Sequence, residues 1–400
     1  MKIAVFGQTL YAGVMAGLWA ETGHQVYWHT NSEQEIAYSF DESLNRLIQQ
    51  QQQLGTLQNV AFDEIPTDVQ AYFFALNASD EAIVSRMVQQ LAERAEVRPK
   101  LMLNGCTFGL HGTEKLKQFA AKDVWAYLPD VIQEGNAIQS FLQLKQVVVG
   151  AEQDYALQLT QEILRPFFPL KQQFLTMPIL DAEFTKLSIS GMLATRISYM
   201  NDLSQVAEKL GIDILNVRQG LASDGRIGSV YLSAGVGFGG ENFSNDILTL
   251  ANTVLNTGVK SRLLEQVWQI NESQKEILFR KLWNYYHGNL ADKTIALWGA
   301  AFKENTSRIE YSPTLAMIDA LLAQGATVQL HDPQALDEIR KRYAHQARLI
   351  LCDDAYAATQ NAHALCLMTA WKQYFSPDFV RLKQQMHHPL LLDGRNIYDP

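Results

Sequence analysis

The sequence predicts an α/β protein in which two α/β domains flank a helical segment. Short apolar stretches alternate with helical patterns at both ends of the chain, which is typical of doubly wound parallel sheets. From residue 182 to about residue 286, strand patterns nearly vanish. We therefore expect a Rossmann-like domain at residues 1–180, a helical domain at 181–288 and a second Rossmann-like domain at 289–400.

The N-terminal domain begins with the pattern of a βαβ unit. Met1–Phe6 is a short apolar strand, Gly7 forms a turn, and a helical pattern continues to Gly23. A second strand follows at His24–His29. Further strands are expected at 71–76, 100–103 and 146–149, with helices between them.

The middle of the chain shows helical patterns that a glycine-rich stretch, Gly235–Gly240, interrupts. We expect this region to end in a long helix through Leu263, Val267, Ile270 and Ile277. The stretch 245–285 is too apolar on one face to stand alone in water, which predicts a partner for that face.

The last part of the chain repeats the strand, glycine turn, helix and strand of the N-terminus at a similar spacing. It begins at Asp292 with DKTIALWG, continues with a helix from about Ser312, and reaches a strand in ATVQLHDP. Strand-like text, LLLDGRNIYDP, ends the chain.

Composition excludes several classes of protein. The 400 residues are 47% hydrophobic and 19% charged, which is ordinary globular composition and excludes a disordered chain. The chain has 33 basic and 42 acidic residues, a net charge of −9, and no basic run. This balance argues against a nucleic-acid partner or a membrane anchor, but it allows a local basic pocket for a phosphorylated small molecule.

The cysteines are few and far apart, at Cys106, Cys352 and Cys366. Their spacing suits a reducing compartment and predicts no zinc or other metal site. The N-terminal text does not read as a secretory leader, and no apolar run reaches the roughly 18 residues of a membrane helix. We therefore expect a cytoplasmic protein.

Six segments, in order along nearly the whole chain, resemble the UDP-glucose/GDP-mannose dehydrogenase family. They are LPDVIQEGNA at 128–137, AEFTKLSISGMLATRISYMND at 182–202, DGRIGSVYLSAGVGFGGENFSND at 224–246, NESQ at 271–274, DKTIALWGAAFKENTSRIEYSP at 292–313 and DGRNIYDP at 393–400. The resemblance implies oxidation of a UDP- or GDP-linked sugar at C6, from alcohol to acid, with two hydrides passing to a nicotinamide cofactor. It also implies a homodimer built on the helical domain and a nucleotide-sugar (UDP)-binding C-terminal domain.

The expected cofactor loop departs from the dinucleotide fingerprint GxGxxG. Gly7 is present, Ala12 is a tolerated third position, and Thr9 replaces the second glycine, where its branched side chain should crowd the pyrophosphate. Thr30 replaces the acid that holds the ribose hydroxyls. Two interpretations remain open: the polar residues 29–32 bind the 2′-phosphate of NADP, or the loop binds NAD or NADP weakly or not at all.

The resemblance assigns substrate-binding and catalytic roles to positions at which this chain mostly has the same residue as the family. Lys186 matches the active-site lysine, and Ser190 stands one helical turn later in place of an asparagine. Glu134 matches a family glutamate, and Asp130 replaces another family glutamate by the shorter acid. Arg226 matches an arginine that crosses the dimer interface. The alternatives are a solvated lysine at Lys186 and a structural cap or surface ion pair at Arg226.

Other substrate-site residues lie later in the chain. The glycine-rich loop can approach a sugar diphosphate closely with its backbone, although simple loop flexibility is the alternative. Glu310 replaces an arginine that approaches the neighbouring subunit's cofactor, and a carboxylate there should repel the pyrophosphate. The positions that the resemblance assigns to substrate in these segments are Gly235, Phe238, Gly239, Lys303 and Arg395.

The family's nucleophile position does not hold a cysteine in this chain. In residues 239–246, GGENFSND, Asn242 replaces the cysteine and Asn245 the lysine, whereas Phe243 and Asp246 remain. In the family a thiolate adds to the C6 aldehyde, and the thiohemiacetal then yields the second hydride. An amide is not a nucleophile, so we expect the full alcohol-to-acid sequence not to run at a useful rate. Oxidation of a hydrated aldehyde, without covalent trapping, is the alternative.

Three interpretations of function follow. The first is a nucleotide-sugar-binding protein with little or no dehydrogenase activity, a pseudoenzyme acting structurally or by regulation in polysaccharide or glycan biosynthesis. The second is an NAD(P)-dependent oxidoreductase that interconverts alcohol and aldehyde through Lys186, Asp246 and Glu134. The third is a dehydrogenase of ordinary outcome that uses an unrecognised mechanism.

Overall fold

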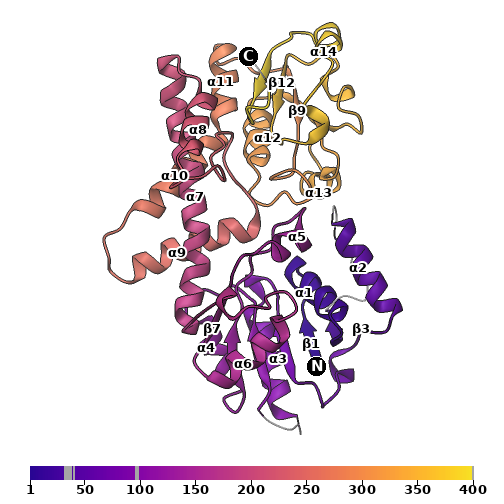
Figure 1. Ribbon diagram of the computed structural model, residues 1–400. Coiled ribbons are helices and arrows are strands. Elements are labelled where there is room, and N and C mark those ends of the chain that lie inside the picture. The colour runs from indigo at the N-terminus through magenta and orange to yellow at the C-terminus, as the bar shows by residue number, and fades with distance from the viewer. Residues whose placement is uncertain (31–37, 39–40, 95–98, 399–400) are drawn as a thin grey trace. The chain divides into compact units, whose positions relative to one another are not determined.

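The computed structural model describes residues 1–30, 38, 41–94 and 99–398 and shows the expected mixed α/β architecture (Figure 1). The chain divides into two compact units, Met1–Ser188 and Ile189–Pro400. Each unit contains one sheet with parallel strands at its centre.

The first unit is built on an eight-stranded sheet, within the residues described, in the order β3-β2-β1-β4-β5-β6-β7-β8. All neighbouring strands are parallel except β6 and β7. The order reverses between β1 and β4, so a crevice is expected beyond the carboxyl ends of these two strands. The strands are β1 (Lys2–Phe6), β2 (Gln25–His29), β3 (Leu57–Asn59), β4 (Ala71–Phe74), β5 (Leu101–Asn104), β6 (Val124–Tyr127), β7 (Val147–Ala151) and β8 (Phe174–Met177).

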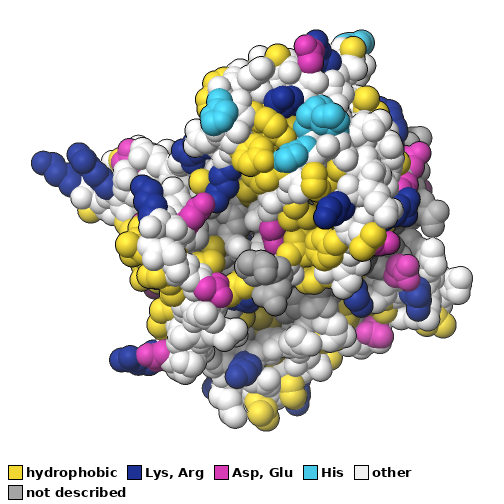
Figure 2. All heavy atoms as spheres, turned by 90° about the horizontal axis from the view of Figure 1, so that it is seen from above, with side chains coloured by type: hydrophobic (Ala, Val, Ile, Leu, Met, Phe, Trp, Pro, Cys, Tyr) yellow, Lys and Arg dark blue, Asp and Glu magenta, His cyan; other side chains and the backbone are white. Residues whose placement is uncertain are grey.

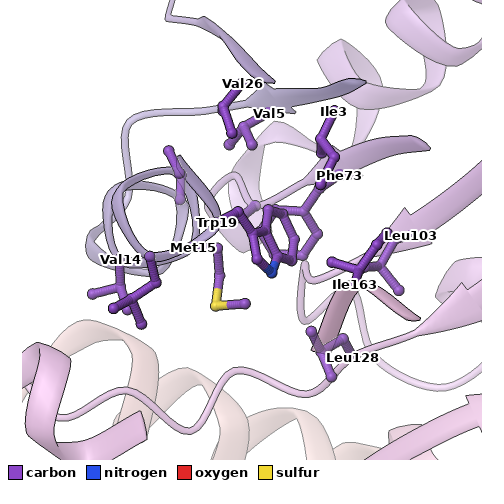
Figure 3. Close-up of a cluster of buried hydrophobic side chains, with 14 of the residues drawn as sticks. Ile3, Val5, Val14, Met15, Trp19, Val26, Phe73, Leu103, Leu128 and Ile163 are labelled. Carbon is purple, nitrogen blue, oxygen red and sulfur yellow. The ribbon is translucent and has the colours of Figure 1, made fainter. Parts of the chain in front are cut away.

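Helix α1 is the centre of one core layer of this unit, because it is apolar on every side. Trp19 packs edge-on against Phe73 of β4, with ring centres 5.1 Å apart (Figure 3), and Val14, Met15 and Val5 belong to the same buried cluster. The helices of the unit are α1 (Leu10–Glu21), α2 (Glu42–Gln53), α3 (Glu81–Glu93), α4 (Gly112–Lys117), α5 (Ala137–Leu142) and α6 (Asp154–Leu164).

Helix α7 (Ile179–Leu210) contains the boundary between the units. The next 75 residues contain helices joined by loops, and no strand is described among them. Ala194 of α7, Ile247 and Val267 meet in a small apolar cluster together with Phe238. The helices that follow α7 are α8 (Ile214–Ser223), α9 (Glu241–Asn256), α10 (Leu263–Lys275) and α11 (Ile277–Tyr285).

The second sheet is fully parallel, with the order β11-β10-β9-β12-β13. Its strands are β9 (Thr294–Trp298), β10 (Thr327–His331), β11 (Leu349–Leu351), β12 (Ala364–Leu367) and β13 (Leu391–Asp393). Its helices are α12 (Pro313–Ala323), α13 (Leu336–Arg342) and α14 (Phe379–Gln385). The short 3-10 helices of the described chain are η1 (Phe62–Glu64), η2 (Ala78–Asp80), η3 (Lys171–Gln173), η4 (Ala357–Thr359) and η5 (Lys372–Tyr374).

The fold class predicted from the sequence is confirmed, whereas the single long helix through residues 263–277 is wrong. Helix α9 ends before Gly258, which has a φ of +75° and so cannot continue a helix. Helices α10 and α11 are separated at Glu276, whose φ of −93° and ψ of −1° depart from helical values. The strands β3, β6, β8, β11 and β12 were not expected.

Acidic and basic side chains are scattered over the face that Figure 2 shows, whereas hydrophobic side chains gather in patches and the histidines in view lie in one part of it. Many exposed charges pair locally, as in Arg340–Asp337 and Lys341–Glu338 of α13. Among the helices of the described ranges, none is both long and apolar enough to cross a membrane.

Candidate functional site

The glycine turn between β1 and α1 has the sharp geometry of a nucleotide-binding loop. Gly7 has a φ of +110°, and a Cβ atom at this position would lie 2.3 Å from the carbonyl oxygen of Ala75. Thr9 is the N-cap of α1: its hydroxyl accepts a hydrogen bond from Ala12 N at 3.2 Å and donates one to Ala75 O at 2.6 Å. Thr9 therefore uses its hydroxyl within the protein.

Thr30 follows directly after the last residue of β2, where the sequence places it. The neighbouring His29 has a ring nitrogen 3.1 Å from Val60 O, and its ring packs edge-on against Phe6 and Phe62. Asn31 and Ser32, the other polar residues considered for a 2′-phosphate, lie outside the described residues. His29 is thus engaged in packing within the sheet edge.

Asp130 and Glu134 lie in the segment between β6 and α5, and both are half-buried. Asp130 shapes the turn by accepting a hydrogen bond from Ile132 N at 2.9 Å. The carboxylate of Asp41, which is 3% exposed, accepts hydrogen bonds from Gly135 N and Ala137 N at 3.2 and 3.0 Å. Asp41 therefore fixes the backbone beside Glu134, a role that the sequence did not reveal.

Lys186 and Ser190 lie one turn apart on α7, on either side of the unit boundary. The Ser190 hydroxyl donates to Asp246 Oδ2 at 2.7 Å, and both side chains are buried. Asp246 belongs to α9, so this hydrogen bond joins two predicted site residues that are 56 positions apart in the sequence. Lys186 is half-buried on α7.

Asn242 is exposed in the first turn of α9, one helical turn before Asp246. The start of a helix stabilises negative charge, which is where a nucleophilic thiolate would be favoured. An amide at this place can donate and accept hydrogen bonds, but it offers no nucleophilic anion. Asn242 therefore places a neutral amide at this helix start.

The glycine-rich loop before α9 is held by three side-chain amides. Asn201 accepts a hydrogen bond from Gly235 N at 2.8 Å, and Gln274 donates to Gly235 O at 2.7 Å. Asn271 accepts from Phe238 N at 2.7 Å and donates to Phe238 O at 3.1 Å. These buried amides satisfy the backbone of a loop that has no strand partner, which explains why NESQ stands at this position.

Close backbone approach explains the glycines at the end of this loop. A Cβ atom at Gly239 would lie 2.5 Å from Tyr311 O, and one at Gly240 would lie 2.8 Å from the Phe302 ring. Gly240 also has a φ of +91° and donates to Glu310 O at 2.8 Å. The glycine loop therefore lies against residues 302–312.

Arg308 is a central charge of this segment. Its guanidinium forms ion pairs with Glu241, the neighbour of Asn242, and with Glu310 at 3.3 Å. Tyr311 donates to Asn245 Oδ1 at 3.2 Å. Glu310, which was expected to repel the cofactor's pyrophosphate, therefore has a cationic partner in its own unit. The sequence analysis did not identify Arg308 as a residue of this site.

Arg395 lies beside the other end of the loop. Its side chain donates to Met368 O at 2.6 Å and to Phe302 O at 3.4 Å, and burial lowers the pKa of its guanidinium. Gly235 is close enough that an added Cβ atom would lie 3.7 Å from the Arg395 side chain. Lys303 is half-buried, with its ammonium 5.9 Å from the centre of the Phe302 ring.

Arg226 is far more exposed than the other predicted site residues, with 90% of its side chain accessible. It forms two hydrogen bonds with Asp224, at 2.6 and 3.0 Å, and this partner lowers the pKa of the Asp224 carboxyl. Within its own chain Arg226 is therefore a surface ion pair, one of the two roles considered for it.

The described part of the chain contains no group of three or more histidine, cysteine, aspartate or glutamate side chains placed to hold a metal ion. The thiols of Cys106 and Cys366 are buried, and burial raises the pKa of both thiol groups, that of Cys106 to about 12. A neutral thiol is a weak nucleophile, so burial disfavours a nucleophilic role for both side chains.

Two family models match the chain. Residues 180–273 match the UDP-glucose/GDP-mannose dehydrogenase family, central domain. Residues 296–400 match the UDP binding domain of the same family. The second match covers β9 to the C-terminus and contains both Lys303 and Arg395.

Several proteins resemble the chain over most of its length. UDP-glucose 6-dehydrogenase of Pseudomonas aeruginosa is 31% identical over 429 aligned positions, which cover 100% of this chain and 94% of that protein. The enzyme of the same name from Rhizobium meliloti is 33% identical over 68% of this chain and 62% of its own length. A solved UDP-glucose dehydrogenase from Pyrobaculum islandicum shares the fold with a TM-score of 0.90, at 24% identity, over 99% of this chain and 94% of its own.

Proposed function

The chain belongs to the UDP-glucose/GDP-mannose dehydrogenase family, and from this premise we propose that it binds a nucleotide sugar but has little or no alcohol-to-acid dehydrogenase activity. The observation that carries the proposal is Asn242 in the first turn of α9, where the sequence resemblance predicts the family's cysteine. The second oxidation needs a covalent adduct at C6, and an amide cannot form it.

The residues expected to hold the nucleotide sugar support the binding part of the proposal. Arg395 and Lys303 place positive charge in the matched UDP binding domain, and the Arg395 side chain lies beside the backbone of Gly235. Arg395 keeps guanidinium donors beyond those that bind Met368 O and Phe302 O, since five N–H groups are available to it. A diphosphate is the ligand chemistry that such an arrangement suits.

The cofactor side fits poorly. A nicotinamide dinucleotide, when bound, would supply the hydride acceptor for oxidation at C6. Gly7 provides the required turn, but Thr9 replaces a glycine. The Thr9 hydroxyl accepts the hydrogen bond of Ala12 N, which is one of the N–H groups at the helix start where pyrophosphate binds in such folds. Thr30 offers no carboxylate to the ribose. We therefore propose weak or absent binding of NAD and NADP.

A second candidate is an oxidoreductase limited to alcohol–aldehyde interconversion. The buried hydrogen bond between Ser190 and Asp246 favours it, because it keeps a carboxylate in place one turn from position 242. Lys186 and Glu134 are the other groups that could move a proton in this reaction. One equivalent of reduced cofactor per sugar, with a trapped aldehyde, would identify this activity.

We further propose a cytoplasmic homodimer that acts in polysaccharide or glycan biosynthesis. The exposed apolar residues of α7, among them Met192, Tyr199 and Val206, support self-association through the helical region. Arg226, exposed beside α8, would then reach a partner's substrate.

The decisive experiment incubates the protein with UDP-glucose or GDP-mannose and either NAD⁺ or NADP⁺, and detects uronic acid by mass spectrometry. We expect no uronic acid from the native chain and none from Asn242→Cys alone, because the cofactor loop remains impaired. Thr9→Gly, Thr30→Asp and Glu310→Arg added to Asn242→Cys give the best chance of rescue. Uronic acid formed by the native chain would refute the proposal.

Ligand binding is tested separately by thermal shift. A ligand that binds only the folded state raises the melting temperature, so we expect one UDP- or GDP-sugar to stabilise the protein. No shift at millimolar concentration of any of these sugars would show that the nucleotide-sugar site is lost.

A further inference from the structure

Side chains that can carry positive charge gather at the amino ends of three strands of the second sheet. His363 directly precedes β12, Lys293 directly precedes β9, and His387 and His388 lie between α14 and β13. The three strands are parallel neighbours, so their amino ends lie at one edge of the sheet. The rings of His363 and His387 have their centres 4.5 Å apart.

The backbone fixes which nitrogen of His363 carries the ring proton. Thr294 N donates to His363 Nδ1 at 3.1 Å, so Nδ1 is an acceptor and the proton of the neutral ring lies on Nε2. Tyr286 donates to His363 O at 2.6 Å and holds the backbone of this residue. Burial, followed by the charges of His387 and Lys293, lowers the pKa of His363. His363 therefore offers a neutral N–H donor at physiological pH.

Tyrosines contact the remaining members of the cluster. Lys293 Nζ lies 4.6 Å from the centre of the Tyr286 ring, which is a cation–π contact. His388 Nε2 lies 2.7 Å from the Tyr285 hydroxyl. Neutral phenols can hold these side chains in place, but they bring no negative charge to this edge of the sheet.

The cluster has no acidic partner in the part of the chain that the structure describes. No ion pair there joins an aspartate or glutamate to Lys293 or to any of the three histidines, and the charged groups that act on His363 are cationic. Asp292, the acid next to Lys293 in the sequence, pairs instead with Arg348 at 3.5 Å. A bound anion would remove the repulsion that such a cluster otherwise contains.

We propose that Lys293, His363 and His387 form a binding site for a tetrahedral oxyanion of the phosphate type. Lys293 supplies an ammonium group, His363 Nε2 supplies a fixed donor, and His387 supplies a charge that increases as pH falls, since histidine changes its charge in this pH range. A doubly charged oxyanion suits these groups, because it accepts several charge-assisted hydrogen bonds at once.

This site is distinct from the proposed nucleotide-sugar site in the same unit. Lys303 and Arg395 follow the carboxyl ends of β9 and β13, whereas Lys293 and His387 precede the amino ends of the same strands. The two sites therefore lie at opposite edges of the second sheet, and the oxyanion site goes beyond the proposed function.

The test is isothermal titration of the full chain with sodium sulfate at constant ionic strength, at pH 6 and pH 8. Sulfate keeps the same charge over this range, so a change in its affinity reports the titration of the protein. We expect a sulfate Kd of about 1 mM at pH 6 and about tenfold weaker binding at pH 8. Inorganic phosphate and glycerol 3-phosphate should compete with sulfate, and the tighter of the two identifies free or esterified phosphate as the ligand.

Three variants remove the binding groups one at a time. Lys293→Gln and His387→Gln should each weaken sulfate binding about tenfold at pH 6, and His387→Gln should also remove most of the pH dependence. His363→Asn keeps a side-chain acceptor for Thr294 N and loses the Nε2 donor, so we expect about fivefold weaker binding at both pH values.

Matched controls change the same residue types elsewhere. His345→Gln and Lys122→Gln alter exposed side chains outside the cluster and should bind sulfate as the native chain does. Circular dichroism and the melting temperature without sulfate check that each variant folds. If His363→Asn does not fold, Lys293→Gln and His387→Gln still decide the test.

The proposal would be overturned if the native chain bound neither sulfate nor phosphate at tens of millimolar. It would also be overturned if Lys293→Gln and His387→Gln bound sulfate as tightly as His345→Gln does. An equal sulfate affinity at pH 6 and pH 8 would show that the role given to His387 is wrong. Uronic acid formation and the melting curves with UDP-sugars test the proposed function separately, and neither result affects this titration.

Discussion

The two units begin with the same local arrangement but use their polar residues differently. Gly7 follows β1 with a φ of +110°, and Gly299 follows β9 with a φ of +104°. Gly7 N donates to His29 O at 3.1 Å and Gly299 N to His331 O at 2.8 Å, so each glycine is fixed by the last residue of the next parallel strand. The residue after that histidine is Thr30 in the first unit and Asp332 in the second.

Asp332 shows what an acid at this position does in the second unit. Its carboxylate accepts hydrogen bonds from Ala300 N, Ala301 N, Gln334 N, Ala335 N and the Trp371 indole, at 2.7 to 3.0 Å. The acid therefore organises the long segment between Gly299 and α12. In the first unit α1 starts soon after Gly7, and the hydroxyl of Thr9 caps it instead. An acid directly after the second strand, a pattern that suggests nucleotide binding, can thus stabilise the protein's own loop backbone instead.

The largest expected effect in this comparison is the loss of the Asp332 carboxylate. Asp332→Ala leaves buried N–H groups unpaired, so we expect the free energy of unfolding to fall by about 3 kcal/mol. Thr30→Ala, at the equivalent position, should change it by less than about 0.5 kcal/mol. Urea titrations followed by tryptophan fluorescence compare the two. Equal effects would show that the two turns do not differ as described.

The helix caps should behave alike. Thr9 accepts from Ala12 N and donates to Ala75 O, and Ser312 accepts from Thr314 N and donates to Ala300 O. Thr9→Ala and Ser312→Ala should each cost about 1 kcal/mol of stability, with Ser312→Ala the larger because Ser312 is buried. Thermal melts of both variants, with Thr9→Ser as a conservative control, measure the effect. If Thr9→Ala left the stability unchanged, Thr9 would not act as a helix cap.

The smallest effect concerns pH. Burial lowers the pKa of His331, whose ring lies 2.6 Å from the Tyr374 hydroxyl, despite the opposing effect of Asp332. The unfolded chain then takes up a proton at a higher pH than the folded chain, so stability should decrease slightly as pH falls below about 6.5. His331→Gln should flatten this part of the stability curve. If the free energy of unfolding of His331→Gln changed between pH 7.5 and 5.5 as steeply as that of the native chain, the role given to His331 would be wrong.

The sequence predicted the fold class well because its signals are local. The apolar strand, Gly7 and the apolar helix after it reproduce β1 and α1 to within a few residues. The strand Val124–Tyr127 is too short for its sequence pattern to be distinguished from that of other apolar segments. The break at Glu276 was missed because the apolar periodicity continues on both sides of it.

The candidate site was predictable where a motif carried it and not where distant residues meet. Asn242 and the glycine loop could be located from the segment that contains them. Asp41 could not, because its hydrogen bonds with Gly135 N and Ala137 N cross 94 and 96 positions. Asp332 had a visible signal, an acid directly after an apolar strand, but its five donors come from separate segments.

The amide clamp on the glycine-rich loop has a consequence for the energetics of recognition. Asn201, Asn271 and Gln274 fix the backbone at Gly235 and Phe238 when the protein folds. The conformational entropy of these residues is therefore lost during folding, and a ligand that meets the loop does not have to order it again. Such a preorganised surface retains its shape whether or not any reaction follows, so selection for binding alone is sufficient to maintain it.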